Sequence, residues 1–472
     1  MINQCNSLGV LNNVKNRPGP IVVDESIKVH EIVYQLFVQK VDHFNLLDDR
    51  TFNQRFIVNS KYWNGTGPVF FIINGESSME LDAVISCQYT IWAQKVSALI
   101  VSLEHRYYGG SHVMEDMSTD NLKYLTTQQA LADCVVFIEW FTTKYYYVPP
   151  LSKIITFGGS YAGTLAAYLA MKYPSTISFS VASSAPLNPV VNFYQYMEVI
   201  QKTILSLENG EKCLKNIKLA NNKIIEMVHD PILTKNITKL FGLCSNIELE
   251  NDISTFMFEI ANAWGTAAQY GNLQPGYPSL DILCKVMVDD SLDPLSNYIN
   301  VWFRYKNSDD CIDVSYSTMI SIFQYSQINH LNTRNDLFNM SRQWLFQTCT
   351  EFGFFITSDS FEQPFTNFNF NYQKQICADV FGKKVIQPSI SWTLAEYGGV
   401  SPNYNSVKNV LFVSSSNDPW SSLSISKSEQ YKTVIVENGT HCSDMIPLNN
   451  ASVPDVSRAQ NEIFRYILDV LN

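Results

Sequence analysis

Short apolar runs that alternate with segments of helical spacing make up much of the first part of the chain. The apolar run Val69–Ile73 lies between Gly67-Pro68 and Asn74-Gly75, and it predicts a strand. Residues 83–95 have helical spacing, and the apolar residues 98–103 predict the next strand. Because a strand, helix and strand in this order form a crossover unit, we expect a largely parallel sheet.

The same alternation continues beyond this unit and returns near the end of the chain. The further elements that the pattern predicts are a helix over 127–143, a strand over 153–157, a helix over 162–173, a strand over 178–183, strands over 410–413 and 434–436, and a closing helix over 457–471. The predicted fold class is therefore α/β.

Two regions depart from this alternation. Residues 1–34 are rich in Asn, Pro and Gly, which is typical of an extended lead-in, and no charged start followed by an apolar stretch is visible, so no signal peptide is expected there. Residues 190–385 show helix-like segments and long polar connections, which predict a mainly helical insertion. We therefore expect an α/β core made of residues 35–189 and 386–472.

The overall charge narrows the choice of partners. Hydrophobic residues make up 46% of the 472 residues and charged residues 16%, a balance typical of a compact globular protein. The formal net charge of -11 disfavours nucleic acid and anionic membrane surfaces, which would repel the chain. No apolar run reaches roughly 18 residues, so we expect no membrane insertion.

The cysteines indicate disulfides. The chain has ten cysteines, an even number, without the closely paired spacing of a zinc site, so we expect no metal centre. The chain also contains five Asn-x-Ser/Thr glycosylation acceptors, Asn64, Asn236, Asn339, Asn438 and Asn450. Together these features favour an oxidising, secretory route, which leads to a secreted protein or to the lysosomal or endosomal lumen.

The strongest chemical motif is Phe157-Gly158-Gly159-Ser160-Tyr161-Ala162-Gly163, between a predicted strand and a predicted helix. It indicates a nucleophile elbow, in which small neighbours let a serine hydroxyl project above the sheet. The alternative is a glycine-rich turn that binds a phosphate at a helix N-terminus. That alternative is disfavoured because no Gly-x-Gly-x-x-Gly follows the strand Val69–Ile73 and no Gly-Lys-Ser/Thr occurs.

A serine nucleophile needs a base, and the base needs an acid that holds its tautomer. In a fold with this elbow the order along the chain is serine, acid, histidine. His441 follows the predicted strand 434–436, and Asp418 follows the predicted strand 410–413. We therefore expect Ser160, Asp418 and His441 to form a catalytic triad that needs no cofactor.

The oxyanion that forms during acyl transfer must meet fixed N–H donors. By the logic of this fold, one donor is the backbone of Tyr161, and the other comes from the loop after the strand Val69–Ile73, at Gly75. Fold and triad alone leave the substrate open, so an esterase or lipase and a non-catalytic binding protein remain alternatives to a peptidase.

Motifs along most of the chain resemble the prolyl carboxypeptidase and dipeptidyl peptidase II family of serine peptidases. The matching segments are Val41-Asp42-His43-Phe44, Thr51-Phe52-Asn53-Gln54-Arg55, Glu104-His105-Arg106-Tyr107-Tyr108-Gly109, Gly158 to Gly163, Arg342-Gln343-Trp344, Gln347-Thr348-Cys349-Thr350-Glu351-Phe352-Gly353, Asp418-Pro419-Trp420 and His441-Cys442-Ser443-Asp444-Met445. The chain departs from the family's pattern at Ser414-Ser415, before the acid, and at Ser77, after the early strand.

The resemblance implies an α/β-hydrolase fold with a large, mainly helical cap insertion, and a peptide substrate cleaved near one chain end. The same three residues, Ser160, Asp418 and His441, are the triad that it implies. A dipeptidyl peptidase needs an anion for the substrate amine, for which Glu76 and Glu351 are candidates, whereas a carboxypeptidase needs a cation, for which Arg106 is the candidate. The sequence leaves the oligomeric state open, a homodimer included.

Overall fold

A computed structural model of the chain describes residues 32–271, 277–306, 308, 310–328, 336–382, 388–403, 406–447 and 454–472. Most of the predicted lead-in and the acceptor Asn450 lie outside the described residues, and the side chain of Asn339 does too. Among the described helices, none combines the length and the apolar character that a membrane span requires.

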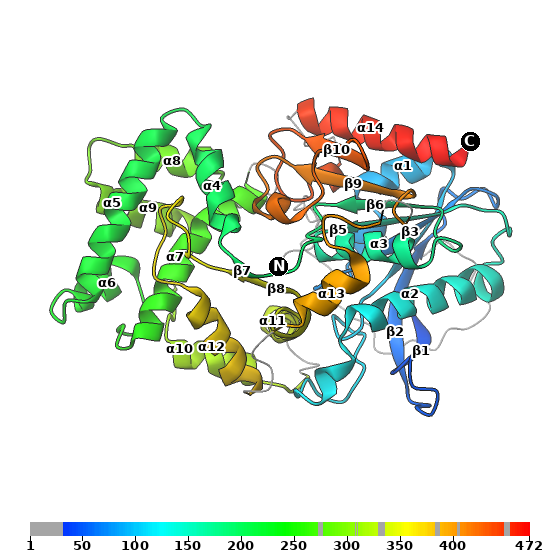
Figure 1. Cartoon of the computed structure of the whole chain (residues 1–472), viewed down its shortest axis with the longest axis horizontal. Coiled ribbons are helices and arrows are strands. Elements are labelled where there is room, and N and C mark those ends of the chain that lie inside the picture. The colour runs from blue at the N-terminus through cyan, green and yellow to red at the C-terminus, as the bar shows by residue number, and fades with distance from the viewer. Residues whose placement is uncertain are drawn as a thin grey trace.

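Within the described residues, an eight-stranded sheet forms the centre of the core, in the order β1-β2-β4-β3-β5-β6-β9-β10 (Figure 1). Its strands are β1 (Tyr34–Lys40), β2 (Thr51–Asn59), β3 (Val69–Ile73), β4 (Leu99–Leu103), β5 (Ile154–Gly159), β6 (Phe179–Ser183), β9 (Val410–Ser415) and β10 (Lys432–Val436). β2 pairs antiparallel with β1 and β4, and all the other neighbours pair in parallel. The predicted largely parallel sheet is confirmed.

Helices cover both faces of this sheet. Helices α1 (Gln88–Val96) and α14 (Pro454–Leu471) pack on one face, and α2 (Thr127–Trp140) and α3 (Tyr161–Lys172) pack on the other. Along β3, alternate side chains enter the two hydrophobic cores on opposite faces. This arrangement explains the continuous apolar run of β3, since a strand buried on both faces cannot alternate with polar residues.

The predicted mainly helical insertion lies between β6 and β9 in the sequence and forms a separate lobe, the cap, beside the sheet (Figure 1). Its elements are β7 (Val190–Phe193), α4 (Gln195–Leu205), α5 (Gly210–Val228), α6 (Thr234–Phe241), α7 (Glu250–Tyr270), α8 (Leu280–Met287), α9 (Pro294–Lys306), α10 (Tyr316–Gln324), α11 (Asp336–Gln347), η4 (Thr348–Phe352), β8 (Gly353–Ile356) and α12 (Phe370–Phe381). Strands β7 and β8 pair in parallel, so the beginning of the insertion lies beside a late segment of it.

The remaining described elements are short, apart from α13. They are η1 (Leu81–Val84), η2 (Asn121–Tyr124), η3 (Phe141–Tyr145), α13 (Ile390–Tyr397), η6 (Pro419–Leu423) and η7 (Ser443–Met445). The helix predicted over 83–95 is therefore divided into η1 and α1. The helix predicted over 127–143 changes to π-helical geometry at Phe141.

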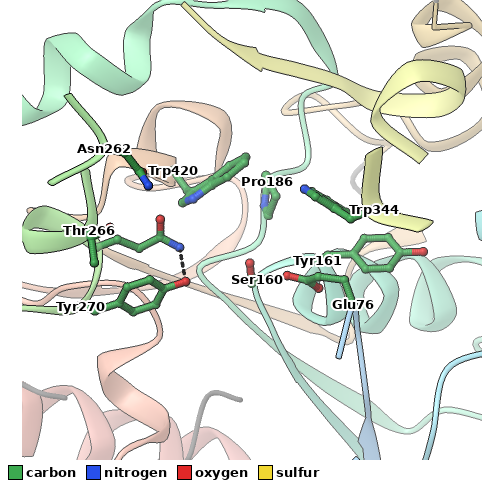
Figure 2. A pocket seen from close by; sticks show the side chains of 10 residues that line it. Glu76, Ser160, Tyr161, Pro186, Asn262, Thr266, Tyr270, Trp344 and Trp420 are labelled. Carbon is green, nitrogen blue, oxygen red and sulfur yellow. Dashed lines mark hydrogen bonds between the residues drawn. The ribbon is translucent and has the colours of Figure 1, made fainter. Parts of the chain in front are cut away.

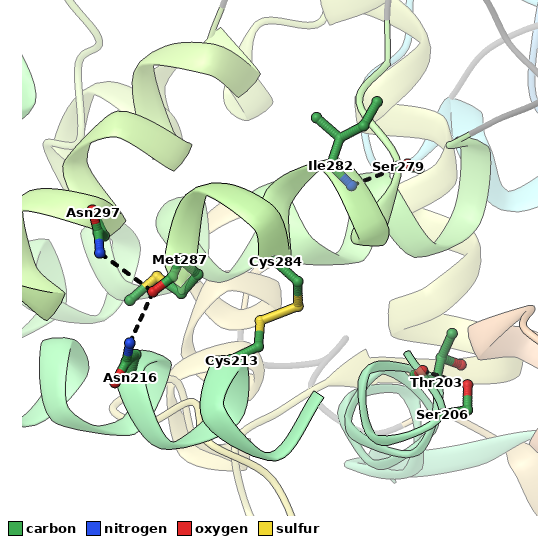
Figure 3. The surroundings of a disulfide bond; sticks show 9 residues. All are labelled: Thr203, Ser206, Cys213, Asn216, Ser279, Ile282, Cys284, Met287 and Asn297. Carbon is green, nitrogen blue, oxygen red and sulfur yellow. Dashed lines mark hydrogen bonds between the residues drawn. A yellow bond between two sulfur atoms is a disulfide. The ribbon is translucent and has the colours of Figure 1, made fainter. Parts of the chain in front are cut away.

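The expected disulfides are present in the cap, where the described residues contain Cys213–Cys284, Cys244–Cys311 and Cys349–Cys377. The first of these joins α5 to α8, and beside it the side-chain amides of Asn216 and Asn297 both donate to the backbone carbonyl of Met287 (Figure 3). Cys87 is also disulfide-bonded, whereas Cys134 and Cys442 are free, buried thiols.

The sequence pattern missed strands β1 and β2. Their buried positions include two glutamines, Gln39 and Gln54, which interrupt the apolar alternation expected of a strand. The structure gives the amide nitrogens of both glutamines acceptors, because Nε2 of Gln39 donates to Oε1 of Gln54 (3.0 Å) and Nε2 of Gln54 donates to the carbonyl of Glu104 (2.8 Å). Polar pairs of this kind are visible only once the strands are paired.

Candidate active site

Ser160, the predicted nucleophile, lies at the sharp turn between β5 and α3. Its φ is 58° and its ψ is -131°, a backbone conformation that residues other than glycine rarely adopt. Its N–H donates to the carbonyl of Ser183 at the end of β6 (2.9 Å), and its carbonyl accepts from the N–H of Thr164 in α3 (3.0 Å). These bonds hold the strained turn in place, as a nucleophile elbow requires.

Two glycines let strand and helix approach each other at this turn. A Cβ atom on Gly158 would lie 2.0 Å from the carbonyl oxygen of Ala162, and one on Gly163 would lie 2.6 Å from the carbonyl oxygen of Ser183. Both distances are shorter than van der Waals contact, and the neighbouring atoms belong to the backbone, so a side chain at either position would push α3 away from the sheet.

Asp418 and His441, the predicted acid and base, are buried and in direct contact. Nδ1 of His441 lies 2.8 Å from Oδ2 of Asp418, and Oδ1 of Asp418 accepts from the N–H of Trp420 (3.0 Å). The two residues lie on loops that follow the neighbouring strands β9 and β10. These loops are also joined through their backbones, because the N–H of Asn417 donates to the carbonyl of Gly439 (3.1 Å).

The charge of Asp418 controls the protonation of the imidazole. Burial of His441 disfavours the imidazolium, but the adjacent Asp418 carboxylate outweighs this effect and raises the pKa of His441 well above its ordinary value. A second carboxyl, that of Asp444, lies nearby and accepts from the hydroxyl of Ser183. Burial raises the pKa of Asp444 to about 6, so it is partly neutral in mildly acidic surroundings.

A pocket with a volume of about 180 Å³ opens over Ser160 (Figure 2). The core and the cap both contribute to its lining, with Glu76, Ser160, Tyr161, Pro186 and Trp420 from the core and Asn262, Thr266, Gln269, Tyr270 and Trp344 from the cap. Pockets for drug-sized ligands measure roughly 300–1,000 Å³. The smaller volume here suits a short segment at the end of a chain.

His441 lies behind two aromatic walls of this pocket. The ring centroids of Tyr270 and Trp420 are 6.3 and 6.4 Å from that of the imidazole. Within the described residues, Nε2 of His441 is buried without a hydrogen-bond partner, so it is not bonded to the hydroxyl of Ser160. Hydrogen bonds between catalytic groups are often long in the absence of substrate and tighten when it binds.

The loop after β3 lies against the start of α3, where the oxyanion donors were predicted. A Cβ atom on Gly75 would lie 3.3 Å from the backbone nitrogen of Ala162, so the two backbones are neighbours. Tyr161 is the first residue of α3, and its N–H has no acceptor within the helix. Glu76 follows Gly75 and lines the pocket, and burial raises the pKa of its carboxyl.

Two other candidates for binding a substrate terminus are engaged elsewhere. Both carboxylate oxygens of Glu351 accept from the N–H of Thr127 (3.1 Å each), at the start of α2, and one also accepts from the Thr127 hydroxyl (2.9 Å). Arg106 is fully buried and binds Asp133 through Nε (2.7 Å) and Nη2 (2.6 Å). Neither side chain lines the pocket, so the structure does not bring Glu351 or Arg106 to the pocket over Ser160.

Sequence reasoning missed the contribution of α7. Between residues 261 and 270, the four that are not fully buried are Asn262, Thr266, Gln269 and Tyr270, and all four line the pocket. Their spacing places them on one face of the helix. The sequence feature that could have indicated this contribution is a polar face on an otherwise apolar helix. The sequence does not show which part of the protein that face contacts.

The fold and the elbow together define an α/β-hydrolase. Residues 39–463 match the serine carboxypeptidase S28 family. Thymus-specific serine protease from Mus musculus is 30% identical over 452 residues, which cover 92% of this chain and 86% of that protein. Lysosomal Pro-X carboxypeptidase from Bos taurus is 28% identical over 435 residues, which cover 86% of this chain and 81% of that protein.

The chain belongs to the serine carboxypeptidase S28 family. It is a serine peptidase and its substrates are peptides, in agreement with the resemblance found in the sequence. Among solved structures, proline iminopeptidase from Mycobacterium smegmatis aligns over 92% of this chain and 99% of its own, with a TM-score of 0.40 and 9% identity.

Proposed function

We propose that this serine exopeptidase uses Ser160 as nucleophile, His441 as general base and Asp418 as the residue that orients the base. The observation that carries the proposal is the buried contact between Nδ1 of His441 and Oδ2 of Asp418 (2.8 Å), beside a pocket lined by Ser160. The contact uses Nδ1, so Nε2 of His441, which has no hydrogen-bond partner within the described residues, is the nitrogen that can accept the proton of the serine hydroxyl.

In this mechanism the hydroxyl oxygen of Ser160 attacks the carbonyl carbon of the scissile peptide bond, and Nε2 of His441 takes the hydroxyl proton. The imidazolium gives that proton to the leaving amine as the C–N bond breaks. Water then attacks the acyl-enzyme with the same nitrogen as base, which releases the acid product and restores Ser160. Asp418 holds the imidazole through Nδ1 and stabilises the imidazolium.

In this proposal the tetrahedral oxyanion accepts hydrogen bonds from the backbone N–H groups of Tyr161 and Gly75. The free N–H at the start of α3 and the close approach of Gly75 to Ala162 support it. Such donors stabilise charge that is present only in the transition state.

At the substrate end, we propose that Glu76 binds the free α-ammonium, which makes the enzyme a dipeptidyl peptidase. Glu76 is the acidic residue that lines the pocket, and no cationic side chain lines it within the described residues. Arg106, the candidate for a terminal carboxylate, is occupied by Asp133. A buried carboxylate paired with an ammonium ion gives a strong, charge-assisted hydrogen bond.

A carboxypeptidase is the second candidate, favoured by the likeness to lysosomal Pro-X carboxypeptidase. An esterase or lipase on the same fold is a weaker candidate, because a neutral acyl ester offers no partner to Glu76. A non-catalytic binding protein would leave the strained conformation of Ser160 without a use.

We further propose that the protein acts in the lysosomal or endosomal lumen or after secretion. The described disulfides and the exposure of the acceptors Asn64, Asn236 and Asn438 support this proposal. Lysosomal Pro-X carboxypeptidase carries such a location in its name.

Mass analysis of the products from a mixed peptide library tests the substrate end. We expect N-terminal dipeptides to be released, and N-acetylation of the library to stop their release. Release of single C-terminal residues, unaffected by N-acetylation, would establish the carboxypeptidase instead. Labelling by an organophosphonate probe tests the nucleophile, and a label found on any residue other than Ser160 would contradict the mechanism.

A further inference from the structure

The cap does more than border the pocket, because the end of helix α7 is bonded to the residue proposed as general base. The backbone N–H of His441 donates to the backbone carbonyl of Gln269 (3.1 Å). Gln269 is the penultimate residue of α7. The last four carbonyls of a helix accept no hydrogen bond from an N–H of the same helix. The loop that carries His441 therefore satisfies one of the free carbonyls of the cap helix.

The side-chain amide of Gln269 is hydrogen-bonded through both its oxygen and its nitrogen. The hydroxyl of Tyr196, on α4, donates to Oε1 of Gln269 (2.9 Å), and Nε2 of Gln269 donates to the hydroxyl of Tyr270 (2.7 Å; Figure 2). Tyr196 is 3% exposed, so water does not readily replace Gln269 as the hydrogen-bond partner of its hydroxyl. These bonds restrain the end of α7 at the position where it meets His441.

The rings of the two tyrosines pack against His441 and against Trp420, the neighbour of Asp418. The ring of Tyr196 packs edge-on against the ring of Trp420 (5.8 Å between centroids), and the backbone N–H of Trp420 donates to Asp418. The ring of Tyr270 packs edge-on against the imidazole of His441 (6.3 Å). The base therefore contacts one of the tyrosines that Gln269 connects, and the other tyrosine is linked to the acid through Trp420.

We propose that Gln269 is a positioning residue for the catalytic base, through which the cap sets both the place and the protonation of His441. This inference rests on the proposed roles of Ser160 and His441. The terminal carbonyls of an α-helix carry a partial negative charge, so the end of α7 stabilises an imidazolium beside it. The cap thereby acts on the chemical step as well as on substrate access.

Other charged and titratable groups also face His441, and their effects must be held constant in any test. They are Asp418 after β9, Glu76 after β3, Asp444 and Cys442 on its own loop, and Tyr270 on α7. A substitution at Gln269 or Tyr196 leaves all of these residues in the chain, but Gln269→Ala also removes the hydrogen bond to the hydroxyl of Tyr270. Tyr196→Phe keeps that bond and therefore reports more directly on the end of α7.

The test compares three variants, Tyr196→Phe, Gln269→Ala and the control Tyr298→Phe. Tyr298 lies on α9, is buried, and donates its hydroxyl to the carbonyl of Ile260 in the middle of α7 (3.4 Å). The control therefore removes the same hydroxyl group from a contact with the same helix, one that does not reach Gln269. Rates of acylation by p-nitrophenyl acetate are measured, because this small ester needs no contact with the cap.

We expect acylation to slow about five-fold in Tyr196→Phe, as the loss of one hydrogen bond predicts, and about ten- to fifty-fold in Gln269→Ala. The acid limb of the pH profile of kcat/KM should shift to lower pH in both variants, because the imidazolium loses stabilisation and the pKa of His441 falls. Tyr298→Phe should stay within about two-fold of the unaltered protein, with an unshifted limb.

Unaltered acylation rates and superimposable pH profiles in Tyr196→Phe and Gln269→Ala would overturn the inference. An equal loss in Tyr298→Phe would overturn it as well, since a general loosening of the cap would then explain the effect. If Gln269→Ala fails to fold by circular dichroism, the conservative Tyr196→Phe decides alone. A lack of ester turnover and of Ser160 labelling in the unaltered protein would instead contradict the proposed function.

Discussion

The core and the cap supply different parts of the candidate site. From the core come side chains on loops at the carboxyl ends of parallel strands, with Glu76 after β3, Ser160 after β5, Asp418 after β9 and His441 after β10. From the cap comes mainly one face of the helix α7. The proposed nucleophile, acid and base belong to the first set, whereas the cap contributes side chains that line the pocket, so substitutions in the two regions should have different kinetic signatures.

The two regions are also stabilised differently. Both regions bury apolar side chains, and one hydrophobic cluster extends from a face of the sheet into the cap, but the described disulfides Cys213–Cys284, Cys244–Cys311 and Cys349–Cys377 all lie within the cap. A disulfide restricts the unfolded chain. Because none of these three joins cap to core, reduction should weaken the cap more than the core.

The largest effect should come from the core, in Ser160→Ala. Removal of the nucleophile from a serine triad lowers kcat by roughly 10⁴- to 10⁶-fold while the fold persists. Turnover of an X-Pro dipeptide amide and labelling by an organophosphonate probe measure this loss. Ser401→Ala, at an exposed serine in a turn, is the control and should keep full activity. Residual turnover of a tenth or more in Ser160→Ala would identify another nucleophile.

The next largest effect should come from the cap, in the double variant Cys213→Ala and Cys284→Ala. The bridge spans 71 residues, and the loss of a native disulfide of this kind costs about 2–4 kcal/mol. We expect calorimetry to show a cap transition at lower temperature, with the core transition unchanged. Cys134→Ala, which removes a free thiol from the core, is the control. A single transition that shifts as a whole would mean that the two regions unfold together.

At the pocket between core and cap, Glu76→Gln should weaken binding of the substrate amine without slowing the chemical step. Loss of a charge-assisted hydrogen bond costs about 1.5–3 kcal/mol, so kcat/KM for a dipeptide amide with a free amine should fall about 10- to 150-fold. Acylation by p-nitrophenyl acetate should be nearly unchanged, since that ester has no ammonium group. Glu429→Gln, at an exposed glutamate, is the matched control. Equal losses on both substrates would assign Glu76 to the chemical step.

The core was easier to predict from the sequence than the cap. Strand β3 is apolar throughout because both of its faces are buried, and the glycines around Ser160 report a close approach of strand and helix, so local sequence carries both features. The pocket face of α7 depends on which distant loop it meets. Glu351 illustrates the same limit, since its partner Thr127 lies 224 residues away and the sequence alone could only name Glu351 as one candidate for the substrate amine.

The smallest effect concerns the boundary between cap and core, where η4 carries Glu351 against the start of α2. Burial raises the pKa of Glu351 to about 7, above its ordinary value of 4.5. Between these two pH values the folded protein retains a proton that the unfolded chain has lost, so stability falls as the pH rises through this window. The protein should therefore melt at a higher temperature at pH 5 than at pH 7.5.

Glu351→Gln removes this titration and should reduce the difference in the free energy of unfolding between the two pH values by about 1–3 kcal/mol. Thermal melts at both pH values measure the change, with Glu362→Gln, at an exposed glutamate, as the control. Buried Asp444 has a pKa raised to about 6 and adds to the same trend, so the variant should weaken the pH dependence without abolishing it. An unchanged difference would mean that Glu351 is ionised at the boundary, and that its contacts with Thr127 stabilise the charged form.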